Sequence, residues 1–401
     1  MMSAVILTST NSLFRRLKIG SLKKSSRLSS LDTFRGICIT TMVFVNDGAG
    51  QYRSLEHAVW NGLSLADVVF PWFVWIMGAS VPFSMYSALR REAKVSEMFR
   101  IILLRSAKLF VIGFCLNSVA GSNDLTTYRV MGVLQRLSIG YLFTSLAYLM
   151  ALFTNKKANT LSVVLIILIV MVAVETTHLS IVYLLPVPGC PTGYLGPAGM
   201  SENRKYLPNC IGGAAGYIDQ LIIGNAHIYQ HAEASIKYKS LPFDPEGLLG
   251  CLPTIFNALV GSIAGLIFLK QNDPRHRTLL HGVGMLVTFI PTVVLTHFTL
   301  DDGWIPINKH LWSLSFVLAT SSMAFFSLGL LYFIIDVQEL WNGAPFLMAG
   351  MNSILIYIGH TVFYCLFPFN WNWEGIRSHW FYLPESLWSS YLWLLIAVYL
   401  L

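Results

Sequence analysis

The stretch TLSVVLIILIVMVAVETTHLSIVYLL, residues 160–185, is a long and nearly unbroken run of apolar side chains. The hydrocarbon core of a bilayer is about 30 Å thick, so a helix needs about 20 mostly apolar residues to cross it. This stretch is long enough to do so and is bounded by polar segments on both sides. It predicts a membrane-spanning helix.

Similar apolar runs occur along the chain, at residues 36–46, 67–89, 101–119, 131–153, 247–269, 279–298, 311–335, 346–368 and 385–401. The first is short, but it reaches the length of a span if Leu31–Thr33 and Asp47–Gly50 continue the helix. The composition agrees, because 55% of the residues are hydrophobic and only 12% are charged. We therefore predict an all-α fold, a polytopic membrane helix bundle of about ten transmembrane helices.

The distribution of Lys and Arg predicts how this bundle is oriented in the lipid bilayer. Short loops that are rich in these residues stay in the cytosol, and this rule places both termini there. Residues 1–30 then form a basic cytosolic segment and residues 31–401 the transmembrane domain, whose one long loop, 186–246, lies on the outer face. This topology accounts for the net charge of +7, so we expect no nucleic-acid partner.

Two cysteines, Cys190 and Cys210, lie in the long outer loop, which is rich in proline and glycine. Disulfides form in oxidising compartments such as an organelle lumen or the extracellular space. We therefore expect this pair to be joined and the loop to form a disulfide-stapled cap. No pair of cysteines has the spacing of a metal site, so no metal is expected.

Polar side chains are concentrated between the first two predicted spans, where Asn46, Asp47, His57, Asn61 and Asp67 follow one another closely. A histidine that contacts a carboxylate is the usual arrangement for a base whose tautomer must be fixed. The alternative is structural. The histidine would lie at the membrane interface, and the aspartate would interact with the positive end of a helix dipole.

Positive charges at membrane depth allow two interpretations. Arg136 lies inside the fourth predicted span, where it either contacts a phosphate or carboxylate of a ligand or forms an ion pair with an acid such as Asp67. Arg35, three residues after Asp32, and Lys108 in the third span are typical of structural or interfacial cations.

Two later segments carry polar side chains that could face a common cavity. Asn352 and His360 return to nearly the same helical face after about two turns. Asn308 and Lys309 lie at the outer mouth of the eighth predicted span. Hydrogen bonding between helices explains each of these residues as well as contact with a substrate does.

Several collinear blocks closely resemble the membrane part of the lysosomal heparan-α-glucosaminide N-acetyltransferases. They cover nearly the whole chain after residue 27, and they read RLSSLDTFRGI (27–37), HAVWNGLSLADVVFPWFVWIMG (57–78), GVLQRL (132–137), LLPVPGCPTGYLGPAG (184–199), GGAAGYID (212–219), DPEGLLG (244–250), INKHLWSLS (307–315) and GMNSILIYIGH (350–360).

This resemblance implies an acetyltransferase of the lysosomal membrane that acts as a homodimer. It would use cytosolic acetyl-CoA, and no metal, to acetylate the terminal glucosamine of heparan sulfate in the lumen. The resemblance also implies that His57 is the active-site histidine, with Asn46 and Asp67 as its companions. The chain would correspond to the membrane part of the family, without the lumenal domain that precedes it in animal members.

These expectations define roles for the residues singled out above. His57 acts either as a general base or as a nucleophile that forms an acetyl-imidazole, and Asp67 orients it while Asn46 donates a hydrogen bond. The predicted contacts to the coenzyme are Arg136, Arg35 and Lys108. The predicted contacts to the glucosaminide are Asn61, Asn308, Lys309, Asn352 and His360.

Two other classes of function remain compatible with the residues. In a transporter or channel, the buried His and Asp would form a proton relay. An inactive short form of the enzyme would keep the fold without the activity.

Overall fold

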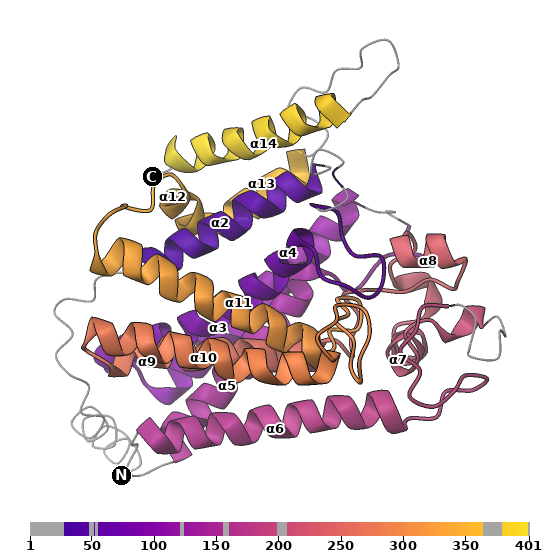
Figure 1. Ribbon diagram of the computed structural model, residues 1–401, viewed down its shortest axis with the longest axis horizontal. Helices are drawn as coiled ribbons and strands as arrows, with labels where there is room; N and C mark the ends of the chain where they lie inside the picture. The colour runs from indigo at the N-terminus through magenta and orange to yellow at the C-terminus, as the bar shows by residue number, and fades with distance from the viewer. Residues whose placement is uncertain are drawn as a thin grey trace.

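A computed structural model describes residues 28–47, 52, 55–120, 124–154, 160–198, 207–363 and 379–399 (Figure 1). The regular elements within these ranges are helices, and the β-type pairing among them is an isolated bridge between Asn61 and Asn308. The all-helical prediction is confirmed. The basic segment predicted for residues 1–30 lies almost wholly outside the described residues.

The helices coincide with the predicted apolar runs, except for two short ones between residues 214 and 238 that lie within the predicted outer loop. They are α2 (Ser29–Asn46), α3 (Leu65–Arg90), α4 (Val95–Ala120), α5 (Val133–Thr154), α6 (Thr160–Leu184), α7 (Ala214–Ile222), α8 (Glu233–Tyr238), α9 (Cys251–Lys270), α10 (Pro274–Thr296), α11 (Leu314–Leu331), α12 (Phe346–Met351), α13 (Ser353–Phe363) and α14 (His379–Tyr399). The first apolar run is extended at its amino end, because α2 begins at Ser29.

Six of these helices, α3, α5, α6, α9, α10 and α11 with its π-helical continuation to Val337, are long and apolar enough to cross a membrane. The protein is therefore a polytopic helical membrane protein. Helices α2, α4 and α14 lie at the positions of further predicted spans. The prediction of a single helix over 346–368 was wrong in one respect. The helix is interrupted at Asn352, which separates α12 from α13.

Helices α3 and α9 form the centre of the bundle and approach each other at backbone distance. A Cβ atom built on Gly78 of α3 would lie 1.9 Å from the carbonyl oxygen of Ala258. Atoms built on Gly261 and Gly265 of α9 would lie 2.0 and 2.2 Å from the carbonyl oxygens of Trp75 and Ala79. Glycines four residues apart are a common device for such close packing of membrane helices.

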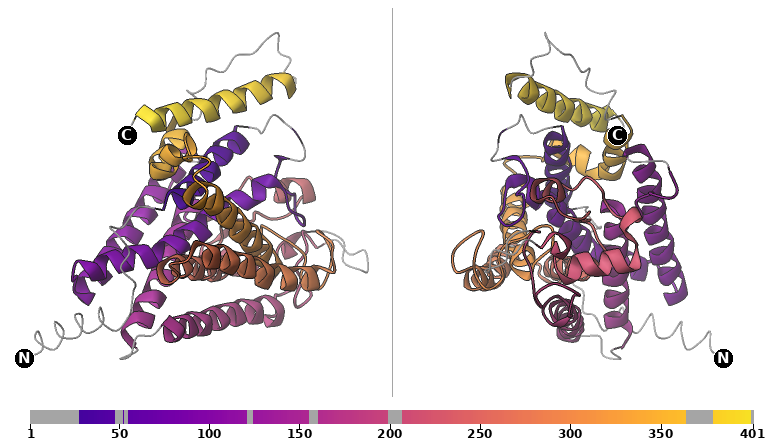
Figure 2. Two further views of the ribbon diagram at one scale, coloured as in Figure 1. Left: turned by 60° about the vertical axis from the view of Figure 1, so that its left-hand side comes forward. Right: turned by 90° about the vertical axis from the view of Figure 1, so that its right-hand side faces the viewer.

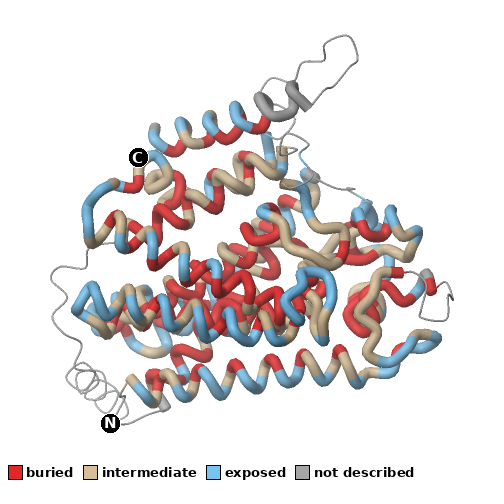
Figure 3. Tube along the Cα trace, viewed as in Figure 1, coloured by how far each residue is buried: buried red, intermediate tan, exposed pale blue. Residues whose placement is uncertain are grey.

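The remaining helices surround this pair. Over an apolar stretch of 18 residues in each helix, 83% of the residues of α9 are buried, against 22% for α6 and 17% for α10. Helices α6 and α10 accordingly lie at the periphery (Figure 3). The start of α2 and the end of α14 lie at one end of the bundle, and α7 and α8 lie at the other (Figures 1 and 2).

The long loop between α6 and α9 forms a cap over one end of the bundle. The structure joins Cys190 to Cys210, as predicted from the sequence. Trp60, from the connection before α3, packs edge-on against Phe243 of the cap and donates a hydrogen bond from Nε1 to the carbonyl oxygen of Leu195. The cap is therefore fixed to the segment that carries His57.

A buried carboxylate in the cap makes the stability of the folded protein dependent on pH. Asp219 of α7 is 3% exposed, and its Oδ1 accepts a hydrogen bond from the backbone amide of Leu248. Burial, reinforced by the negative charge of Asp244, raises the pKa of Asp219 from 3.8 to about 7. Its ionised form is thus disfavoured in the folded protein.

We predict that Asp219 makes the fold more stable in acid than at neutral pH. Its contribution is complete below the pKa of the unfolded chain and is lost as the pH rises from about 4 to about 7. Asp219→Asn should therefore reduce the fall in unfolding temperature between pH 5 and pH 7.5, measured on the purified protein. Asp301→Asn, in an exposed loop, is the control and should leave it unchanged. An unaltered pH dependence in Asp219→Asn would contradict this assignment.

Candidate active site

His57 and Asp67 are brought together where α3 begins. His57 Nδ1 lies 2.9 Å from Asp67 Oδ1. Asp67 Oδ2 accepts hydrogen bonds from the amide of Ala58, the amide of Ser64 and the hydroxyl of Ser64, at 3.1, 3.0 and 2.9 Å. Asp67 is wholly buried, whereas the side chain of His57 is 40% exposed. One oxygen therefore caps the helix, and the other is held toward the imidazole.

A second loop, between α10 and α11, is joined to the segment that carries His57. Asn61 and Asn308 form the isolated β-bridge, and Asn308 Nδ2 donates to Asn61 Oδ1 at 3.0 Å. The imidazole of His310 stacks on the ring of Trp60, with 5.3 Å between centroids. These contacts place Lys309, which lies between the two polar residues, directly beside His57.

Among the described residues, Lys309 is a cation in direct contact with the imidazole. Its Nζ lies 2.8 Å from His57 Nδ1 and 3.4 Å from Asp67 Oδ1, and its side chain is 14% exposed. Burial lowers the pKa of Lys309, while the carboxylates of Asp67 and Glu246 act in the opposite direction. Burial and the charge of Lys309 together lower the pKa of His310 to about 4, so this neighbour is neutral.

Glu246 brings a second carboxylate to the same place. Its Oε2 accepts a hydrogen bond from Arg129 Nη2 at 2.7 Å. Burial alone would raise the pKa of Glu246, but the positive charges of Arg129 and Lys309, with the hydrogen bond from Arg129, together outweigh burial and hold this pKa below its usual range. Glu246 is therefore an anion at neutral pH.

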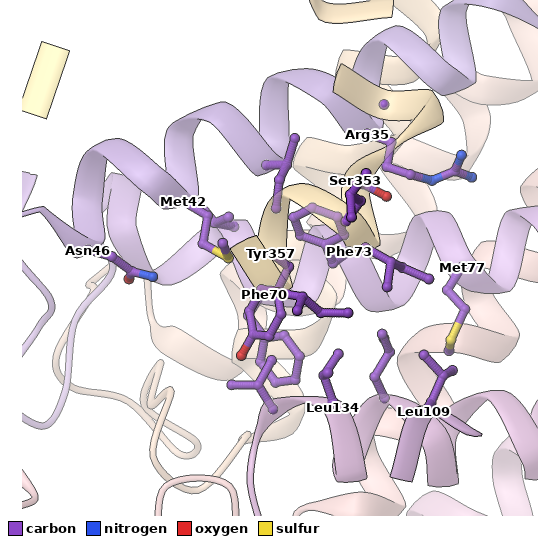
Figure 4. Close-up of a pocket in the computed structure, with 18 of the residues that line it drawn as sticks. Arg35, Met42, Asn46, Phe70, Phe73, Met77, Leu109, Leu134, Ser353 and Tyr357 are labelled. Carbon is purple, nitrogen blue, oxygen red and sulfur yellow. The ribbon is translucent and has the colours of Figure 1, made fainter. Parts of the chain in front are cut away.

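These residues lie at one end of an elongated cavity of about 700 Å³. Its walls come from α2, α3, α4, α5 and α13, through side chains that include Met42, Phe70, Phe73, Met77, Leu109, Leu134 and Tyr357 (Figure 4). Asn46 and Arg35, both on α2, lie at opposite ends. The separation of eleven positions between them corresponds to about 16 Å along the helix axis.

The end of the cavity near Arg35 also carries positive charge. Arg35 contacts Asp32 Oδ1 at 2.8 Å and Ser80 Oγ at 2.9 Å. Arg105 lines the same cavity, and its guanidinium lies over the ring of Tyr141 at 4.7 Å from the centroid. Two guanidinium groups therefore face one cavity whose other end carries His57.

The structure places the two other predicted coenzyme contacts elsewhere. Arg136 is wholly buried outside the cavity lining. It donates to the carbonyl oxygens of Pro245 and Gly250, and it stacks over Trp312 at 4.4 Å. These contacts hold the segment that contains Glu246. Lys108 is exposed on α4 and does not line the cavity.

The predicted substrate contacts divide in the same way. Lys309 and Asn352 line the cavity, and Asn352 does so at the break between α12 and α13. Asn61 and Asn308 instead bond to each other, and neither lines the cavity. His360 is 4% exposed, and its Nε2 lies 3.4 Å from Asp47 Oδ1, so it joins α13 to the end of α2.

Sequence reasoning missed Glu246 and assigned Arg105 no part in the site. A signal existed for each. Glu246 lies in the block DPEGLLG, which belongs to the resemblance, and Arg105 is an ionisable residue within an apolar helix. The proximity of Glu246 to His57 could not be inferred, because it depends on how the cap folds back onto the bundle.

The arrangement has the parts that acyl transfer requires. An oriented imidazole can take a proton from a nucleophile, and neighbouring donors can stabilise an oxyanion. The elongated apolar cavity can hold a long thin donor whose charged end reaches the two arginines. Among the described residues, no group of three or more His, Cys, Asp or Glu side chains could hold a metal ion.

The chain is similar in sequence to known proteins. Residues 27–194 match the family model described as heparan-alpha-glucosaminide N-acetyltransferase, catalytic. The human heparan-alpha-glucosaminide N-acetyltransferase is 43% identical over 388 residues, which cover 92% of this chain and 58% of the relative. The mouse enzyme is 40% identical over 388 residues, covering 93% and 59%. The chain thus spans less than two thirds of the length of either relative. Over more than nine tenths of its own length, the chain is therefore similar in sequence to heparan-alpha-glucosaminide N-acetyltransferases.

Proposed function

We propose that the protein transfers an acetyl group from acetyl-CoA to the terminal glucosamine of heparan sulfate. The observation that carries this proposal is the cavity, with the His57–Asp67 pair at one end and Arg35 and Arg105 at the other. The names of the relatives supply the acceptor. The length of the cavity suits a coenzyme that enters at one face and presents its acetyl group at the other.

The charges at the two ends suggest which substrate enters where. The phosphates of a coenzyme are anionic, and guanidinium groups bind phosphate strongly. Arg35 and Arg105 would therefore hold the coenzyme at the end away from the cap. The acceptor would approach His57 from the cap side, and Asn352 would contact the arm of the coenzyme between the two ends.

The contacts of His57 support a role as general base. Because a carboxylate only accepts hydrogen bonds, a proton on His57 Nδ1 is donated to Asp67, and the lone pair is then on Nε2. Nε2 would take a proton from the attacking amine and pass it to the departing thiolate. Asn46 and Lys309, which also line the cavity, would stabilise the negative charge on the thioester oxygen.

The cap indicates the compartment on the acceptor side. Its Cys190–Cys210 disulfide is typical of an oxidising compartment, which supports a lumenal position for this face and a cytosolic position for the opposite one. The lysosomal membrane, the cytosolic termini and the homodimer stay predictions from the sequence.

The first test is the loss of transfer in His57→Ala. We expect the turnover number to fall by about 10²- to 10⁴-fold, because the substitution removes the base. The measurement is acetyl transfer from labelled acetyl-CoA to a fluorogenic glucosaminide, with membranes that contain equal amounts of each variant. His310→Ala serves as a comparison, because it removes a neighbouring imidazole that faces Trp60 instead. Full activity in a folded His57→Ala protein would disprove the proposed role.

The second test reverses the tautomer of His57. In Asp67→Asn the amide oxygen should take the place of Oδ2, where three donors converge, and leave the NH2 group facing His57 Nδ1. The ring proton would then be on Nε2, and no lone pair would remain there for the amine. We expect a fall in turnover of about 10²- to 10⁴-fold, as for the corresponding change in serine proteases.

Ser64→Ala is the matched control for Asp67→Asn, because it weakens the same helix cap and leaves the carboxylate in place. It should lower stability by about 1 kcal/mol and leave most of the turnover intact. Equal losses of activity in both variants would show that Asp67 acts only on folding.

The third test separates the role of Arg35, which lines the cavity, from that of the buried Arg136. Arg35→Ala should raise the KM for acetyl-CoA by about 10- to 100-fold with a smaller effect on turnover, since it removes a charged hydrogen bond to the coenzyme. Arg136→Ala should instead lower the yield of folded protein, because its guanidinium holds Pro245 and Gly250. A normal KM in Arg35→Ala would contradict the placement of the coenzyme.

A further inference from the structure

An amine of the chain itself occupies the position that the acceptor amine must reach. Lys309 Nζ lies 2.8 Å from His57 Nδ1 and 3.4 Å from His57 Nε2. It also lies 3.4 Å from Asp67 Oδ1, and both Lys309 and Glu246 line the cavity. An oriented base and two carboxylates around a primary amine are the surroundings that an amino sugar would need for acetylation.

The surroundings of this lysine favour its neutral, reactive form. An ammonium ion has no lone pair, so only the neutral amine attacks a thioester. The side chain is 14% exposed, and burial lowers the pKa of Lys309 although Asp67 and Glu246 oppose this effect. His57 Nε2, which carries the lone pair when Nδ1 donates to Asp67, lies 3.4 Å from Lys309 Nζ, and such contacts are often this long before the reacting complex forms.

We propose that Lys309 is an internal acceptor, acetylated by the same site when no amino sugar is bound. The proposal rests on the proposed function, because it requires an acetyl thioester in the cavity. A bond forms between Lys309 Nζ and the acetyl carbon while the carbon–sulfur bond breaks. The proton lost by Nζ passes through His57 to the thiolate, which leaves as a free thiol. The product is a neutral N-acetyl-lysine.

This modification would inhibit the enzyme. Acetylation removes the positive charge beside Asp67 and adds an acetyl group in the space next to His57, where the sugar must bind. The acceptor and Lys309 compete for one base, so a saturating acceptor protects the lysine. The fraction of acetylated Lys309 thus increases with the time that the enzyme holds the donor without an acceptor.

The test is mass spectrometry of the purified full chain. The protein is incubated with isotopically labelled acetyl-CoA, without acceptor or with saturating glucosamine, and acetylation is quantified at Lys309. Lys237, exposed on α8 of the same cap face, reports the background chemical reaction. We expect Lys309 to be labelled at least about ten times faster than Lys237, and this excess to disappear with glucosamine and in His57→Ala.

A second measurement follows activity after preincubation with acetyl-CoA, each variant normalised to its own starting rate. The wild type should lose activity in parallel with labelling, whereas Lys309→Arg, whose guanidinium is not acetylated, should not.

The outcomes separate the two proposals. Transfer to the glucosaminide with no label on Lys309 overturns the internal acceptor and leaves the proposed function intact. Label on Lys309 that depends on His57, without transfer to the sugar, supports the internal acceptor and overturns the proposed sugar. Equal labelling of Lys309 and Lys237, or equal labelling in His57→Ala, shows chemical acetylation only and overturns the internal acceptor. Neither label nor transfer overturns both.

Discussion

The backbone contact between α3 and α9 is the constraint on which the rest of the bundle depends. Gly78, Gly261 and Gly265 allow two apolar helices to approach until the backbone of one leaves no room for a Cβ atom beside the carbonyl groups of the other. In a membrane, where apolar side chains gain little by leaving lipid, such close van der Waals packing is a main source of association. The opposite face of α3 is then free to line the cavity with Phe70 and Phe73.

The same helix connects stability with chemistry at its first turn. Asp67 closes a capping box with Ser64 through one carboxylate oxygen and faces His57 with the other. Because the capping box at the start of α3 fixes the carboxylate of Asp67, the imidazole is oriented without a separate structural element. The bridge between Asn61 and Asn308 adds the loop that carries Lys309, so three chain segments meet at one imidazole.

Much of this could be predicted from the sequence, and the failures have a common cause. The apolar runs predicted the helices, and polar density predicted that His57 and Asp67 belong together. The break at Asn352 was missed, because Gly350 and Asn352 are each compatible with a continuous membrane helix, and the close approach of Gly350 to the backbone of α2 depends on the tertiary fold. Arg136 and His360 were predicted as ligand contacts, yet Pro245 and Asp47 face them. Periodicity identifies the face of a helix but not the partner that covers it.

The single elongated cavity has a consequence for the energetics of the proposed reaction. With the coenzyme entering from one face and the acceptor from the other, the acetyl group passes to the amine on the cap side, and the amine proton ends on the sulfur, which leaves with the coenzyme toward the opposite face. The acyl fragment and the proton carry equal formal charge in opposite directions. The exchange is electroneutral, so a voltage across the bilayer neither drives nor opposes turnover, and the thioester alone supplies the driving force.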